Sequence, residues 1–159
     1  MLSPELFRAA LSRFPNGVTV VTARDKGGVD YGMTVSSFCS LSLVPPLVII
    51  CIEQGTALHL ALQQASHFAV NVLAFDQEDL ARRFADSDRT RVDGVPFARG
   101  LTGNVLLEGT LASYECAIRE RIAGGDHTIF TGEVMAVSAR DGRPLVHHRG
   151  DYTRLDPLG

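Results

Sequence analysis

Two segments of apolar–polar alternation, separated by a glycine-rich turn, constrain the fold of this chain most strongly. In the first segment the apolar positions are Ala112, Tyr114, Cys116 and Ile118, and in the second they are Phe130, Val134 and Ala136. Gly124-Gly125-Asp126 separates the two segments. Alternation with a period of two is typical of a strand that buries one face. The sequence therefore predicts two long strands over these segments.

The remaining segments add further strands and only a few short helices. We expect strands at 18–23, along the serine-rich stretch from residue 31, and at 47–52, 67–74 and 145–155. We expect helices at 2–14, at 56–64 and after Asp76, and a long loop at 85–103. Their capping signals are Ser3-Pro4, Thr56 and a capping box of Asp76 with Asp79. About seven strands without regular β–α alternation predict a mostly β, antiparallel barrel with a few short helices.

Length, composition and charge narrow the class of protein. The 159 residues are expected to form a single domain, residues 1–159, with an ordinary soluble composition of 45% hydrophobic residues. A net charge of −3 gives no support for binding to nucleic acid or to an anionic membrane. The apolar runs are too short to span a bilayer, and we find no signal peptide. We therefore expect a cytoplasmic protein.

Several kinds of site are not indicated by the sequence. It has no Rossmann glycine motif, no phosphate-binding P-loop and no nucleophile elbow. The three cysteines, Cys39, Cys51 and Cys116, are unpaired in sequence and are expected to be buried free thiols. The histidines show no zinc-ligand spacing, and His147 and His148 should point to opposite faces of one strand. We therefore predict no metal site.

Small hydroxyl side chains gather in the stretch that leads to Pro45-Pro46. They are Thr34, Ser36, Ser37, Ser40 and Ser42. Each such residue gives up the roughly 0.8 kcal/mol that a buried methyl group would contribute in its place. Two interpretations remain open: the hydroxyls and neighbouring N–H groups face a polar ligand, or this is a solvated edge strand.

Five segments in sequence order resemble the short-chain flavin reductase family, the reductase partners of two-component flavin-dependent monooxygenases. The segments are FRAALSRFPNGVTVVTA, GMTVSSFCSLSLVPPLVIICI, HFAVNVLAFDQEDLARRFA, GGDHTIFTGEV and HHRGDYTRL. This resemblance implies a Greek-key split β-barrel, usually a homodimer, that binds FMN or FAD and uses NADH or NADPH. It also implies that reduced flavin passes to a partner monooxygenase.

The resemblance also implies a set of site residues. The flavin segment would be Met33, Thr34, Val35, Ser36 and Ser37, with Cys51, Glu53, Thr56, Phe84 and Ala85 as further flavin contacts. The matching nicotinamide residues would be His127, to which we assign the catalytic role of anchoring the nicotinamide, and Gly150, Asp151 and Tyr152. Core packing remains the alternative for Cys51 and Phe84, a surface hairpin for His127, and an ordinary strand aromatic for Tyr152.

One departure from the family concerns the flavin phosphate. Related sequences often carry Lys or Arg near positions 53–55, where this chain has Glu53-Gln54-Gly55. Neutralisation of the phosphate would then fall to the start of the helix at Thr56, whose N–H groups can hold a phosphate, or to Arg83, Arg89 or Arg91. The choice between FMN and FAD stays open.

Two other functions compete with the reductase. The first is a flavoprotein that holds FMN tightly and passes electrons to another protein. The second is a non-catalytic module that binds haem or another flat ligand, since a histidine of the His147-His148 pair could ligate iron.

Overall fold

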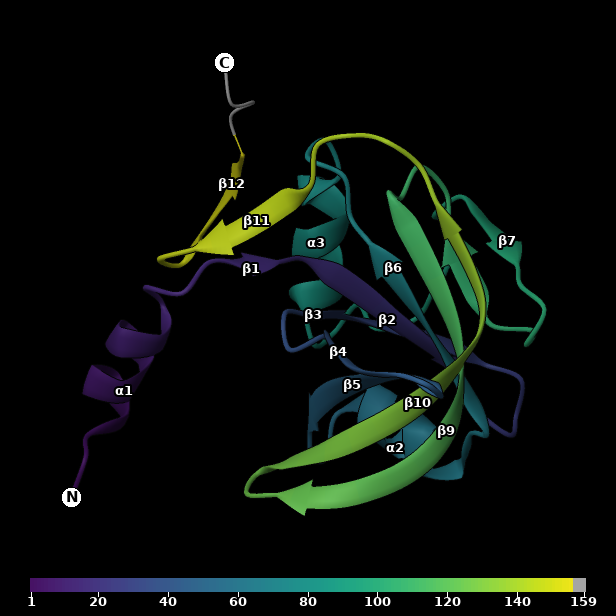
Figure 1. Cartoon of the computed structure of the whole chain (residues 1–159), viewed down its shortest axis with the longest axis horizontal. Helices are drawn as coiled ribbons and strands as arrows, with labels where there is room; N and C mark the ends of the chain where they lie inside the picture. Colours follow the sequence, from purple (N-terminus) through teal and green to yellow (C-terminus); the bar gives the residue numbers. More distant parts are fainter. Residues whose placement is uncertain (156–159) are drawn as a thin grey trace.

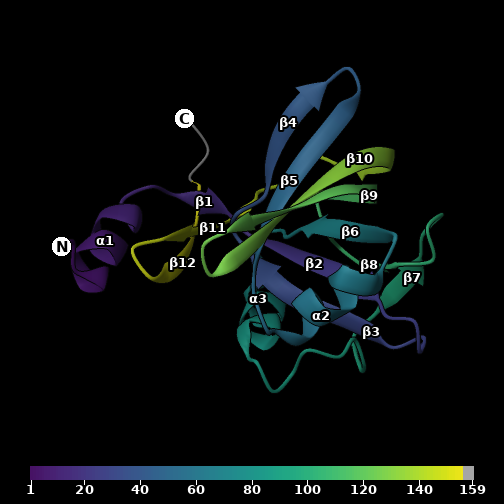
Figure 2. The same cartoon turned by 90° about the horizontal axis from the view of Figure 1, so that it is seen from below.

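The computed structural model describes residues 1–155 as a curved antiparallel β-structure with three short helices (Figures 1 and 2). The helices are α1 (Pro4–Leu11), α2 (Ala57–Gln64) and α3 (Glu78–Ala85). The strands are β1 (Asn16–Gly17), β2 (Thr19–Arg24), β3 (Asp30–Val35), β4 (Cys39–Leu43), β5 (Pro46–Glu53), β6 (His67–Val72), β7 (Phe97–Arg99), β8 (Val105–Leu107), β9 (Ala112–Gly124), β10 (His127–Ala139), β11 (Leu145–His148) and β12 (Asp151–Arg154). The mostly β prediction is confirmed; residues 156–159 of the expected domain lie outside the described residues.

Seven strands form the main sheet in the order β3-β2-β6-β9-β10-β5-β4. Every pairing in it is antiparallel, and the long β9–β10 pair at its centre is the one that the alternation predicts. β1, β11 and β12 form a separate three-stranded sheet, and β7 pairs with β8. Because β2 lies beside β6 and β5 beside β10, residues far apart in sequence meet on this sheet.

Two apolar clusters fill the space inside the curved sheet. The first includes Phe68, Phe130 and Ile50 from three strands and Leu58 and Leu62 from α2, all fully buried. The second gathers side chains around α3, β2 and the β7–β8 pair, among them Leu73, Phe84 and Val105. α2 and α3 are therefore fixed to the sheet through their apolar faces, and their ends border the cavity described below.

Two of the three predicted helix caps are present in the structure. Ser3 caps α1 and Thr56 caps α2, each by accepting a hydrogen bond from the backbone N–H three residues on. The predicted capping box of Asp76 with Asp79 is wrong, because Gln77 precedes α3 and makes no side-chain cap. The Gln77 side chain instead joins the N–H of Ala74 to the carbonyl of Glu108.

Four further expectations differ from the structure. Within residues 1–155 there are twelve strands and not about seven. The expected final strand is a hairpin, because Arg149 and Gly150 adopt positive φ angles of 55° and 88° and reverse the chain. The expected loop at 85–103 contains β7. Cys39 is exposed and Cys51 only half-buried, so only Cys116 is the buried thiol expected.

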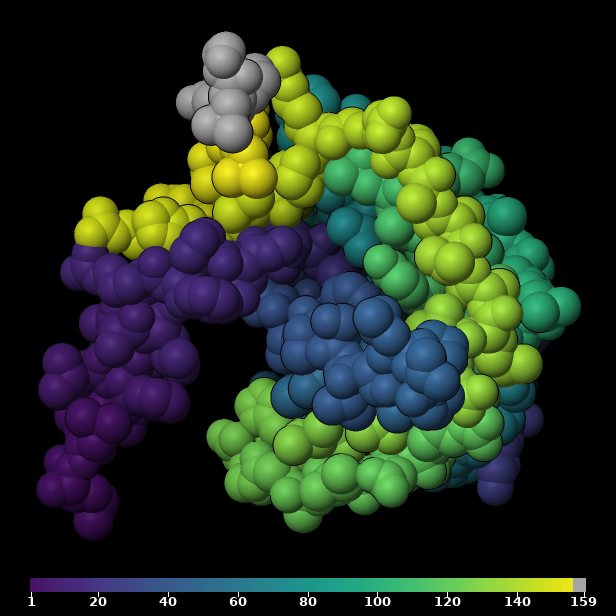
Figure 3. Space-filling model, in the orientation of Figure 1, coloured from purple at the N-terminus to yellow at the C-terminus, as the bar shows by residue number. Residues whose placement is uncertain are grey.

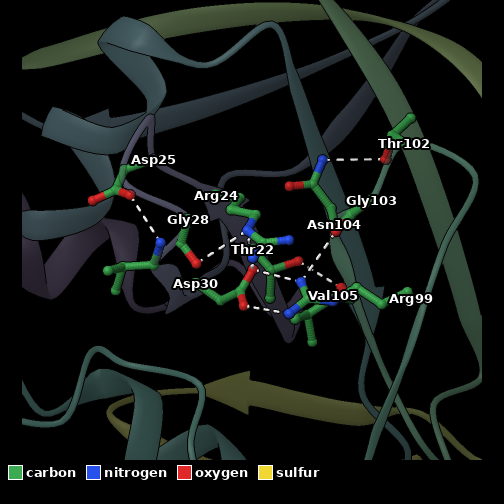
Figure 4. A network of polar contacts seen from close by, with 11 residues as sticks. Thr22, Arg24, Asp25, Gly28, Asp30, Arg99, Thr102, Gly103, Asn104 and Val105 are labelled. Atoms are coloured by element: carbon green, nitrogen blue, oxygen red, sulfur yellow. Dashed lines mark hydrogen bonds and ion pairs between the residues drawn. The ribbon is translucent and has the colours of Figure 1, made fainter.

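Polar contacts fasten the β7–β8 hairpin to the β2–β3 pair (Figure 4). The Arg99 guanidinium donates to both carboxylate oxygens of Asp30, at 2.7 and 2.6 Å, and to the Gly103 carbonyl. The Thr22 hydroxyl donates to the Val105 carbonyl at 2.7 Å. A bidentate arginine–carboxylate pair has a defined geometry as well as charge. This contact therefore sets the position of the hairpin against β3.

The N-terminal helix stands apart from the rest of the molecule (Figures 1 and 3). None of its residues is buried. Its apolar side chains, and those just before and after it, are more than half exposed: Leu2, Leu6, Phe7, Leu11 and Phe14.

Among residues 1–155 no helix is long and apolar enough to cross a membrane.

Candidate functional site

A cavity of about 520 Å³ opens where β3, the end of β5, the start of α2 and the end of α3 meet. This volume lies within the range of about 300–1,000 Å³ typical of small-molecule sites. Five of the predicted flavin contacts line it: Met33, Glu53, Thr56, Phe84 and Ala85. These residues lie on four elements, and the sheet topology brings them together.

The floor of the cavity contains the N-terminus of α2. Gly55, with φ +84°, turns the chain out of β5, and the Thr56 hydroxyl then accepts from the N–H of His59 at 3.2 Å. Thr56, Ala57 and Leu58 all line the cavity. N–H groups in the first turn of a helix have no acceptor within the helix, and the helix dipole favours negative charge there. This end of the cavity is suited to an anion.

The opposite wall is apolar and belongs to α3 and β3. Phe84 is 1% exposed, and its ring lies directly against Gly32. A Cβ added at Gly32 would come within 2.8 Å of that ring, so glycine is required for this close approach. Met33 follows on β3 and lines the cavity with Phe84. Phe84 therefore packs in the core and also borders the cavity, so both interpretations of this residue apply.

The hydroxyl groups of the serine-rich segment have partners within the protein. Thr34 donates to the Ala81 carbonyl of α3 at 2.7 Å, and Ser37 bridges the Cys51 carbonyl and N–H at 2.9 and 3.0 Å. Val35 is buried in the core, and Ser36 is exposed. The expectation of a continuous hydroxyl-lined strand is wrong, because the chain bends at residues 36–38 between β3 and β4.

The bend between β3 and β4 exposes backbone donors. Within residues 1–155 we find no hydrogen bond from the backbone N–H groups of Ser36, Ser37 or Phe38. Backbone N–H groups are strong donors that need an acceptor or water. What this segment offers to a ligand is therefore its N–H groups more than its hydroxyls.

Cys51 lies beside this bend, on β5. Burial raises the pKa of the Cys51 thiol, as does the nearby Cys39, while the Ser37 hydrogen bond lowers it. Since the net direction is upward, Cys51 is a neutral thiol at neutral pH. It can contribute packing to the site but is not an activated nucleophile.

His127 lies beside two residues that line the cavity, Glu53 and Gln54. It begins β10 directly opposite Glu53 of β5, and the Gln54 side chain donates to its carbonyl at 3.3 Å. Its Nδ1 lies 2.7 Å from a carboxylate oxygen of Asp126. The hydrogen bond from His127 lowers the pKa of Asp126, so the carboxylate stays charged and orients the ring. The imidazole and Glu53, a predicted flavin contact, are thus neighbours across one strand pair.

The second predicted nicotinamide segment is not brought to this cavity within one chain. Gly150, Asp151 and Tyr152 belong to the β11–β12 hairpin, whose turn lies on the side of α1 in Figure 1. The Tyr152 ring lies 5.1 Å from the Arg82 guanidinium of α3 and 5.5 Å from the His147 ring. In one chain Tyr152 therefore acts as a packing aromatic.

Several lining residues were not singled out by sequence. Ala57, Leu58, Asp86, Ser87 and Thr90 complete the wall. Ala57 and Leu58 form the first turn of α2 after the Thr56 cap, so the predicted anion site at this helix start already implies them. The other three lie in the expected loop at 85–103, where no motif marks them. A backbone hydrogen bond from the N–H of Gly32 to the carbonyl of Thr90, at 2.7 Å, joins that loop to β3.

The family model of the flavin reductase like domain matches residues 11–156. The chain belongs to this family.

Named relatives match over four-fifths or more of their length. FMN reductase (NADH) SmoA of Agrobacterium fabrum is 43% identical over 149 residues, covering 94% of this chain and 84% of the relative. The reductase subunit HsaB of a flavin-dependent monooxygenase from Rhodococcus jostii is 36% identical, covering 98% and 80%. The structure of NADH:FAD oxidoreductase SgcE6 of Streptomyces globisporus, in complex with NAD and FAD fragments, superposes with a TM-score of 0.92 at 38% identity, covering 99% and 98%.

Proposed function

We propose that this chain reduces FMN or FAD with NADH or NADPH and supplies the reduced flavin to a partner monooxygenase. The observation that carries the proposal is the single cavity formed by Met33, Glu53, Thr56, Phe84 and Ala85, with His127 paired alongside it. The names of the relatives, which are FMN and FAD reductases and a monooxygenase reductase subunit, support the same reaction.

The lining of the cavity fits a flavin nucleotide. The start of α2 would hold the phosphate with its free N–H groups. Met33 and Phe84 would give the ring system an apolar surface. We assign the donors for its carbonyl oxygens and N5 to the N–H groups of residues 36–38, which lie outside this lining. Glu53 and Ala85 complete the walls. Bound flavin supplies the hydride-accepting chemistry, and the protein binds and orients it.

We assign His127 to the nicotinamide. Its charged neighbour Asp126 fixes the ring, and its position opposite Glu53 places it beside the flavin cavity without lining it. Holding the donor carbon about 3–3.5 Å from the acceptor atom accounts for much of the rate enhancement in such transfers. His127 therefore acts by positioning the nicotinamide, and no proton shuttle is assigned to it.

A homodimer is part of the proposal. The apolar face of α1, with Leu6, Phe7 and Leu11, has no cover in one chain, and Figure 3 shows open space between this arm and the rest of the molecule. A second copy would bury that face. Gly150, Asp151 and Tyr152 would contact a nicotinamide only if the dimer brings their hairpin to the partner's cavity. Light scattering after gel filtration measures the dimer directly.

Steady-state oxidation of NADH, followed at 340 nm with FMN and with FAD, tests the function. We expect flavin-dependent NADH consumption from protein that is colourless after desalting. Protein that keeps a yellow flavin after desalting and reduces no added flavin would instead be the electron carrier. Absence of any flavin-dependent NADH loss would contradict the reductase.

A further inference from the structure

A second, arginine-lined cavity adjoins the first. It measures about 400 Å³ and is lined by Arg83, Asp88, Arg89, Thr90, Arg91, Asp93 and Gly94. Thr90 lines both cavities. A further hollow of about 420 Å³, which includes Arg82 of α3, shares Arg83 and Arg89 with the second. Arg82 is paired with Glu78, and Asp79 also lines that hollow, so the arginine-lined cavity beside Thr90 is the basic part of this surface.

Backbone contacts fix this loop against β3. The N–H of Gly32 donates to the Thr90 carbonyl at 2.7 Å, and the N–H of Val92 donates to the Asp30 carbonyl at 3.0 Å. Arg91 also forms an isolated β-bridge with Tyr31. Arg89, Thr90 and Arg91 all line the same cavity.

Arg83 is occupied by contacts within the protein. Its guanidinium donates to the carbonyls of Arg91 and Asp93 and lies 3.4 Å from the Asp93 carboxylate. Arg83 Nε is the one buried side-chain nitrogen or oxygen within residues 1–155 that has no hydrogen-bond partner. Arg83 therefore holds the loop in place. It also pairs with Asp93, so these two opposite charges cancel and add nothing to the net charge of the cavity.

Arg89 and Arg91 remain available. Among residues 1–155 neither guanidinium takes part in a hydrogen bond or an ion pair. Asp88 is the remaining carboxylate on the lining, so the free groups are two cations against one anion. A guanidinium binds phosphate oxygens through paired N–H groups and can stack on a purine ring. The free charge and its geometry suit a phosphate group that extends beyond the first cavity.

We propose that this arginine-lined cavity binds the diphosphate and adenosine of a flavin dinucleotide, and that the chain consequently prefers FAD to FMN. This inference rests on the proposed function. One phosphate reaches the start of α2 in both flavins, whereas only FAD carries a second phosphate and an adenosine past Thr90.

Titration of the purified protein with FAD and with FMN, each followed by quenching of flavin fluorescence, tests the inference. We expect the wild type to bind FAD at least tenfold more tightly than FMN. The double variant R89A/R91A should lose about tenfold in affinity for FAD and less than threefold for FMN. R143A is the matched control, because Arg143 is exposed and lines none of the cavities described above. ADP should compete with FAD and leave FMN binding unchanged.

Three results would overturn the inference, and they separate it from the proposed function. If the wild type binds FAD and FMN equally tightly, and R89A/R91A binds both as the wild type does, the chain has no preference for FAD. The proposed reductase function is then unaffected. If R89A/R91A has a higher KM for NADH than the wild type and an unchanged Kd for FAD, the two arginines bind the nicotinamide dinucleotide instead. If the wild type binds neither flavin, the proposed function fails and this inference fails with it. Retained FMN binding in R89A/R91A confirms that the double variant is folded.

Discussion

Replacing Glu115 by Gln should destabilise the protein by about 2–4 kcal/mol at neutral pH. Glu115 lies on β9 and is 5% exposed. One carboxylate oxygen accepts from the N–H of Leu101 at 3.0 Å, and the other accepts from the N–H and hydroxyl of Thr102 at 2.7 and 2.8 Å. Whichever oxygen becomes NH₂, at least one backbone N–H loses its acceptor. The remaining bonds weaken from roughly 1.5–3 kcal/mol for a charged acceptor to about 0.5–1.5 kcal/mol for a neutral one.

The same contacts predict how this loss depends on pH. Burial raises the pKa of Glu115, but the hydrogen bonds from Thr102 and Leu101 outweigh it, and the pKa lies below its ordinary value of 4.5. A lowered pKa stabilises the fold above the unfolded-state value, and this stabilisation is lost as the pH falls through the folded-state value. We therefore expect the difference between wild type and E115Q to be full at pH 7 and to shrink below pH 4.5.

Urea unfolding followed by circular dichroism, at pH 7 and at several values below pH 4.5, measures both effects. Glu120→Gln is the control, because Glu120 is exposed on the same strand and its side chain makes no hydrogen bond among the described residues. The reasoning is wrong if E115Q is as stable as E120Q at pH 7. It is also wrong if the difference stays constant across the acidic range.

Three further predictions concern the site. His127→Ala should raise the KM for NADH more than the Kd for flavin, and unchanged nicotinamide kinetics would contradict the assignment. Gly32→Ala should cost about 1–3 kcal/mol in unfolding free energy and weaken flavin binding, because the new methyl group displaces Phe84. If Gly32→Ala leaves the melting temperature and the flavin affinity unchanged, the Phe84 ring moves aside without cost and the prediction is wrong. Thr56→Ala should cost about 1 kcal/mol through loss of the cap. Thr56→Ser should retain the cap stability in the same urea assay.

Sequence predicted the strands best where a local signal is long, although Ser113 and Glu115, on the face expected to be polar, are buried. The alternation in β9 and β10 and the turn between them correspond to the longest pair of the sheet, and Ser3 and Thr56 cap helices as expected. The capping box at Asp76 failed because Gln77 precedes α3, and its side chain joins the nearby Ala74 N–H to the distant Glu108 carbonyl. The contact with Glu108 is tertiary, which no local pattern can reveal.

The cavity was only partly predictable for the same reason. Met33, Glu53, Thr56, Phe84 and Ala85 follow from the family resemblance, and the topology brings them together. Thr34 and Ser37 face partners inside the protein because α3 and β5 carry carbonyls within their reach, which depends on how distant elements pack. The bend at residues 36–38, which exposes N–H groups, has no strong turn residue to announce it.

The pairing of His127 with Glu53 makes the tip of the β9–β10 ribbon sensitive to length. Exposed loop tips usually tolerate insertions and deletions well. Here one residue added or removed between Gly124 and His127 would change the two-residue turn that sets the β9–β10 register, and so disturb the position of His127 opposite Glu53. The Asp25–Gly28 turn should therefore accept changes in length, inserted tags and circular permutation. The turn between β9 and β10 should reject them.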